Sequence, residues 1–111
     1  MKIGMMYAMD GEIESLLKNE NAHLIEKVSG ASFYQIRENV VACAGGVGKV
    51  NAAMCAQMLI DLFGVDHLVN TGIAGGIAAG LHVGDVVIGS AAVQHDFDLT
   101  PVGYVRGHIE G

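Results

Sequence analysis

Short, mostly apolar runs separated by turn-forming residues dominate the first seventy residues of the chain. These runs predict strands at Lys2–Tyr7, His23–Val28, Ala31–Arg37, Val40–Ala44 and His67–Thr71. The second, third and fourth runs are separated only by Ser29-Gly30 and Glu38-Asn39, so we expect these strands to form a meander. Further along the chain, Asp85–Ser90 is predicted to be another strand, and Ala91–Thr100 to continue extended toward Pro101.

Two segments have the three- and four-residue apolar spacing of helices. The first follows Asp10, which offers an N-cap. The second is Val47–Phe63, which has alanines that favour close packing and an apolar stripe. The stripe consists of Val47, Val50, Met54, Met58 and Leu62. Strands and helices that alternate in this way indicate an α/β fold with parallel strands in its sheet.

Ligands of open α/β sheets bind beyond the carboxyl ends of the parallel strands, so the turns after Tyr7, Ala44 and Thr71 are the candidate site. The first turn carries acids at the start of a helix. Asp10 is explained by capping, and Glu14 by Lys18 four residues later, but Glu12 has Leu16 at that spacing. A carboxylate without such a partner at a strand-to-helix turn is a candidate general base.

The second and third turns are rich in glycine. The second, Gly45–Lys49, matches neither the phosphate-binding P-loop nor the dinucleotide fingerprint. The P-loop requires glycine where Cys43 stands and serine or threonine where Val50 stands, and the fingerprint requires glycine where Asn51 stands. It indicates close approach of a ligand or tight packing of a helix. The third, Asn70–Ile77, consists of mostly small, uncharged residues. Such a segment could let a flat ring of a ligand lie against the backbone, or it could be a plain connection. Together the turns favour a small, uncharged ligand.

Composition and charge limit the kinds of partner that we expect the protein to bind. Six basic against twelve acidic residues give a net charge of −6, and the basic residues are scattered, so nucleic acid and anionic membranes are not expected partners. No apolar run reaches the length of a membrane span, and no signal peptide is recognised. Hydrophobic residues make up 51% of 111 residues, more than one small core can hide. We therefore expect one domain over residues 1–111, incomplete or with an oligomer interface.

No metal or cofactor is expected. In a strand, His95 would face away from Asp96 and Asp98, so these residues could not converge on one ion. Two cysteines, Cys43 and Cys55, form neither a metal pattern nor a disulfide framework, which favours a reducing cytoplasm.

Five motifs in order and spacing resemble the 5′-methylthioadenosine/S-adenosylhomocysteine nucleosidases of the purine nucleoside phosphorylase superfamily. They are MKIGMMYAMDGE, AGGVGKVNAA, NTGIAGGI, LHVGDVV and HDFDLTPVGY, at residues 1–12, 44–53, 70–77, 81–87 and 95–104. The resemblance covers essentially the whole chain but only about the first half of such an enzyme. It implies a mixed, twisted sheet flanked by helices, usually in a homodimer. The activity it implies is hydrolysis of the bond between ribose C1′ and adenine N9, in the salvage of methionine.

The resemblance also implies site residues. The water-activating glutamate of the family falls on Glu12, which its position in the sequence also makes a candidate general base. Positions near the ribose, the 5′ substituent and the purine match Ala8, Met9, Val47, Ile73, Ala74 and Gly75. Leu99, Val102 and Tyr104 match residues that family members lend to the 5′-alkylthio pocket of the neighbouring subunit.

The chain departs from the family pattern at two positions, where Ile73 replaces a usual serine and Val102 a bulky aromatic residue. In the family, the acid that protonates N7 and the glutamate that binds the ribose hydroxyls lie downstream, beyond Gly111. We therefore expect the 111-residue chain alone to be inactive. The alternatives are a phosphorylase of the same superfamily and a non-catalytic, truncated binding or interaction fragment.

Overall fold

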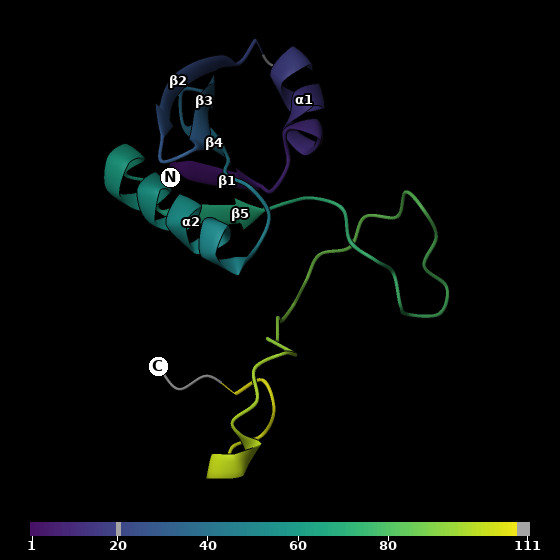
Figure 1. Cartoon of the computed structure of the whole chain (residues 1–111). Coiled ribbons are helices and arrows are strands. Elements are labelled where there is room, and N and C mark those ends of the chain that lie inside the picture. The colour runs from purple at the N-terminus through teal and green to yellow at the C-terminus, as the bar shows by residue number, and fades with distance from the viewer. Residues whose placement is uncertain (20, 109–111) are drawn as a thin grey trace. The chain divides into compact units, whose positions relative to one another are not determined.

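A computed structural model describes residues 1–19 and 21–108 (Figure 1). The chain divides into two compact units, Met1–Gly75 and Gly76–Gly111. The first contains a sheet and two helices, and the second contains a single short 3-10 helix among its described residues. No helix in the described ranges is both long and apolar enough to cross a membrane.

A mixed sheet of five strands forms the first unit. The strands are β1 (Ile3–Tyr7), β2 (His23–Val28), β3 (Ala31–Arg37), β4 (Val40–Ala44) and β5 (His67–Asn70), in the spatial order β2-β3-β4-β1-β5. β2, β3 and β4 pair antiparallel, which confirms the predicted meander. β1 lies parallel to both β4 and β5. The α/β sheet with parallel members is therefore confirmed.

The two helices, α1 (Asp10–Asn19) and α2 (Lys49–Phe63), cover opposite faces of the sheet (Figure 1). Successive side chains of β4 alternate between the faces, as expected of a strand buried on both sides. Val41 and Cys43 pack in the cluster that includes α2, while Ala42 and Ala44 pack in the cluster that includes α1. β4 is thus the centre of the core.

The turn before α2 brings the helix close to the sheet. Gly46 and Gly48 have φ angles of 94° and 107°, which only glycine adopts readily, and the helix begins at Lys49, two residues later than predicted. A Cβ at Gly45 would lie 1.8 Å from Cys55 Sγ. This turn could indicate either a nearby ligand or tight packing of a helix, and tight packing is sufficient to explain why residue 45 is glycine.

The predicted apolar stripe of α2 is only partly buried, since Met54 and Met58 of the stripe pack against the core cluster. Cys55 and Leu59 are buried, whereas Val50 is 83% exposed and Leu62 is 54% exposed. The helix has small or apolar residues on most of its circumference, so periodicity alone does not select the face that packs. The contact of Cys55 with the backbone at Gly45 selects it.

The predicted strand at Asp85–Ser90 is wrong: this segment and Ala91–Leu99 form no strand in the described part of the chain. Val86 and Ile88 are 93% and 91% exposed. An apolar run forms a strand only when a neighbouring strand satisfies its backbone groups.

A tight turn organises the end of the second unit. Thr100–Val102 form a 3-10 helix, and Asp98 accepts hydrogen bonds from the Thr100 backbone and hydroxyl. Asp98 also pairs with Arg106 at 2.7 Å. These contacts lower the pKa of Asp98, with the Thr100 hydroxyl as the main cause.

Replacing Leu59 should test the core. Leu59 is fully buried between α2 and the sheet, so Leu59→Ala should lower the free energy of unfolding by about 2–5 kcal/mol. The half-exposed Leu62 is the matched control, and Leu62→Ala should cost about 1 kcal/mol or less. Urea unfolding measures both. Equal losses for the two variants would show that α2 packs through a different face.

Candidate functional site

Three turns meet at one edge of the sheet, as the parallel strands require. Tyr7 and Ala44 are paired in register at the ends of β1 and β4. The Gly45 N–H donates to the Tyr7 carbonyl at 3.2 Å, and the Thr71 N–H donates to the Met6 carbonyl at 3.2 Å. The segments that follow β1, β4 and β5 therefore leave the same edge.

Glu12 joins two of these turns through its carboxylate. Oε2 accepts hydrogen bonds from the N–H groups of Ala8 and Met9, both at 3.1 Å. Oε1 accepts one from the N–H of Ile73 at 3.2 Å, sixty-one residues away. The acid without a helical partner thus has backbone partners, in the β1–α1 turn and in the segment after β5. Glu14, in contrast, pairs with Lys18 at 2.6 Å as predicted.

These donors lower the pKa of Glu12. The Ile73 N–H is the largest cause, and the Met9 and Ala8 N–H groups add to it against partial desolvation. Nearby, the pKa of Tyr7 is raised, chiefly by burial and also by the negative charge of Glu12. Glu12 is therefore an ionised carboxylate at neutral pH.

The remaining expected site residues differ in their contacts with this carboxylate. Ala8 and Met9 contact it directly, and so does the backbone of Ile73, whose side chain is 83% exposed. Val47 lies in the turn between β4 and α2, where its carbonyl accepts a hydrogen bond from Asn51 at 2.8 Å. Ala74 and Gly75 follow Ile73 and are exposed.

The three residues assigned to a partner's pocket lie in the second unit, on one turn. Leu99 precedes the 3-10 helix, its carbonyl accepts the Tyr104 N–H at 3.2 Å, and Val102 is 68% exposed. The Tyr104 ring stacks on His108, with 5.0 Å between the centroids.

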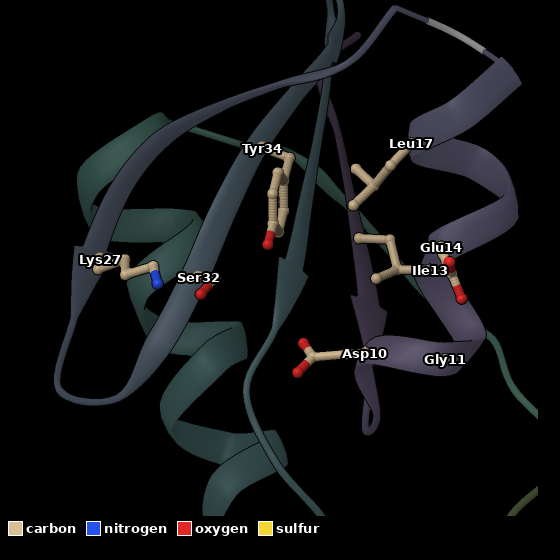
Figure 2. Close-up of a pocket in the computed structure, with 8 residues that line it drawn as sticks. All are labelled: Asp10, Gly11, Ile13, Glu14, Leu17, Lys27, Ser32 and Tyr34. Atoms are coloured by element: carbon tan, nitrogen blue, oxygen red, sulfur yellow. The ribbon is translucent and has the colours of Figure 1, made fainter.

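A separate hollow of about 280 Å³ lies between α1 and the strands β2 and β3 (Figure 2). Ile13 and Leu17 of α1 line one side, and Lys27, Ser32 and Tyr34 of the strands line the other. The side chain of Asp10 points into it. α1 spans Asp10–Asn19, so Asp10 is the first residue of the helix and not the residue before it. Glu12 does not line this hollow, and the candidate site is the edge where Glu12 holds the two turns.

Sequence reasoning missed Gly72. A Cβ at this position would lie 2.6 Å from Glu12 Oε1. The local signal is the glycine in Asn70–Ile77, which suits a flat ligand or a plain connection equally well. Within the described ranges, no three His, Cys, Asp or Glu side chains are grouped to hold a metal ion.

Comparison with known proteins decides the family. The sequence profile described as "Phosphorylase superfamily" matches residues 2–110. The chain belongs to this superfamily. The match includes the parallel strands β1 and β5 and the segments after them that contain Glu12 and Ile73.

Curated proteins that are similar to the chain include 5′-methylthioadenosine/S-adenosylhomocysteine nucleosidases. The chain is 39% identical to that of Hydrogenovibrio crunogenus and 44% identical to that of Oceanobacillus iheyensis. Both matches cover 100% of the chain but only 49% and 50% of the relatives. The chain thus spans about half the length of the curated relatives it matches.

Solved structures of the superfamily give the same result for the fold. The nucleosidase from Streptococcus pneumoniae with the transition-state inhibitor MT-ImmA matches with a TM-score of 0.89 and 40% identity, over 98% of this chain and 49% of that one. The nucleosidase from Streptococcus pyogenes with 5-methylthiotubericidin matches with a TM-score of 0.90 and 37% identity, over 100% of this chain and 48% of that one. The expected phosphorylase-like α/β fold is confirmed.

The lowered pKa of Glu12 predicts a pH-dependent contribution to stability. At pH values above the ordinary glutamate pKa, the ionised Glu12 carboxylate stabilises the folded protein. This stabilisation is lost as the pH falls through the lower pKa that Glu12 has in the folded state. Urea unfolding should therefore show wild type more stable than Glu12→Gln at neutral pH, with the difference vanishing in acid. Glu14→Gln, which breaks an exposed pair, should cost less than about 1 kcal/mol. A wild-type advantage over Glu12→Gln that persists in acid would contradict the donor geometry.

Proposed function

We propose that the full-length protein hydrolyses the N-glycosidic bond of 5′-methylthioadenosine and S-adenosylhomocysteine. The products are adenine and a 5-thioribose, which suits methionine salvage. The observation that carries the proposal is the Glu12 carboxylate, held by three backbone N–H groups at the edge where the parallel strands end. The names of the similar relatives supply the substrate class.

Glu12 would act on water. In the proposed step the water oxygen bonds to C1′ while the bond from C1′ to N9 breaks, and the electron pair of that bond leaves with adenine. Glu12 orients the water and takes its proton. A carboxylate with a lowered pKa is a weak base toward free water, but water that is bonding to an oxocarbenium carbon loses its proton readily.

The leaving adenine needs a proton from an acid. We assign this acid, and the carboxylate that binds the ribose hydroxyls, to the half of the relatives that the chain does not match. On this account residues 1–111 belong to one domain of a larger catalytic fold. The 111-residue chain by itself should then release no adenine from methylthioadenosine, and turnover by it would refute the need for that acid.

Substitution of Glu12 tests its role. In the full-length protein, Glu12→Gln should lower kcat by about a hundredfold or more, since the water is no longer deprotonated. Binding of a non-hydrolysable substrate analogue, measured by calorimetry, should change by less than about threefold, because the amide keeps the size of the side chain and its oxygen can still accept hydrogen bonds from one of the two turns. Glu14→Gln, exposed on the same helix, is the matched control and should retain activity. Equal losses of turnover and analogue binding in Glu12→Gln would mean that Glu12 is only structural.

Phosphorolysis is the second candidate, since the superfamily carries that name and Lys49 begins α2 at the candidate edge. Arg37 ends β3, at the opposite end of the sheet from Ala44, and Arg106 pairs with Asp98. A phosphate requirement for adenine release would favour a phosphorylase, whereas release in phosphate-free buffer favours hydrolysis. A protein that binds nucleoside but releases no adenine under either condition would be a non-catalytic binding module.

We also propose a homodimer in the cytoplasm. Leu99, Val102 and Tyr104 lie on one turn and would reach the 5′-substituent pocket of a second copy. Exposed apolar side chains in the first unit, among them Val50 and Leu62, are compatible with further buried contacts in the whole protein. The free thiols of Cys43 and Cys55 suit a reducing compartment.

A charge at Val102 tests the dimer. Val102→Asp should weaken self-association by about tenfold or more, because an unpaired carboxylate would be buried in the interface. Val105→Asp is the matched control, since Val105 is similarly exposed at 74% in the same unit and lies outside the proposed contact. Sedimentation velocity measures both. A monomeric wild type, or equal effects of the two charges, would contradict this interface.

A further inference from the structure

Gly72 stands where the chain after β5 passes the Glu12 carboxylate. Its φ angle is not in the left-handed region, so its backbone conformation is open to any residue. The reason for glycine is space: an added Cβ would lie 2.6 Å from Glu12 Oε1, 3.2 Å from Cδ and 3.4 Å from Oε2. All three atoms belong to the end of one flexible side chain.

We infer that Gly72 is a positioning residue for Glu12: by lacking a side chain, it lets the carboxylate reach the Ile73 N–H and so sets the place of the base. This inference rests on the proposed function for its catalytic consequence, while the geometry rests on the first unit alone.

The surroundings indicate which group would move if Gly72 carried a methyl group. The backbone on the near side is anchored to the sheet, because the Thr71 N–H donates to the Met6 carbonyl at 3.2 Å. The Glu12 carboxylate lies at the end of a side chain with rotatable bonds, held by hydrogen bonds of 3.1–3.2 Å. The carboxylate would therefore swing away, and the bond from Oε1 to the Ile73 N–H would break first.

Gly72→Ala should thus leave the fold intact and displace only the base. In the full-length protein we expect kcat to fall by about 10- to 100-fold, the range that a misplacement of about 1 Å produces, with KM changed by less than about threefold. The acidic limb of the pH profile should move to higher pH, because loss of the Ile73 N–H removes the largest cause of the lowered pKa of Glu12. Gly11→Ala is the matched control, since Gly11 lies in α1 with open space around its Cβ position.

A double-mutant cycle separates positioning from a general structural effect. In a Glu12→Gln background there is no base to displace, so Gly72→Ala should change the residual rate by less than about twofold. If Gly72→Ala costs as much in this background as in wild type, Gly72 acts on something other than Glu12 and the inference is overturned.

Carboxyl NMR distinguishes failure of this inference from failure of the proposed function. With ¹³C-labelled glutamate in the full-length protein, Glu12 should titrate at higher pH in Gly72→Ala than in wild type, whether or not the protein is a nucleosidase. An unchanged Glu12 titration would overturn the positioning role even in an active enzyme. A shifted titration in a protein that releases no adenine would support the positioning role and refute the proposed function instead.

Discussion

The Glu12 carboxylate binds two turns that are far apart in sequence, and the candidate site depends on this one interaction. The Ala8 and Met9 N–H groups donate to one oxygen and the Ile73 N–H donates to the other. The sheet makes the interaction possible, because parallel pairing of β1 with β5 places both turns at the same edge. The same donors keep the carboxylate ionised, so one set of contacts fixes both the position and the charge of the proposed base.

The architecture that supports this edge was largely predictable from sequence. The bounds of β2, β3 and β4 match the predicted segments, because each run is short, apolar and closed by turn residues. The edge itself followed from the rule that ligands bind beyond the carboxyl ends of parallel strands. Glu12 could be selected because its neighbours on the helix leave its carboxylate without a partner.

Other features depend on contacts that no local pattern reveals. The partners of Glu12 are backbone groups, which every residue carries, so nothing in the sequence marks Ile73 as a donor. The buried face of α2 is centred on Cys55, which lies close to Gly45, and it leaves Val50 and Leu62 of the predicted stripe exposed. The segment Asp85–Ser90 has the composition of a strand, but pairing is a property of two segments and not of one. The role of Gly72 also could not be predicted from the sequence, since it depends on the distance between Gly72 and the Glu12 carboxylate in the folded protein.

In this structure one ionised carboxylate accepts hydrogen bonds from the Ala8, Met9 and Ile73 N–H groups together. Proton NMR of these three backbone amides during an acid titration tests it most directly. We expect all three amide shifts to change with one common midpoint, below the ordinary glutamate range, and Glu12→Gln to abolish the change. An Ile73 amide that does not follow the Glu12 titration, while Ala8 and Met9 do, would show that the two turns are not joined and would contradict the account.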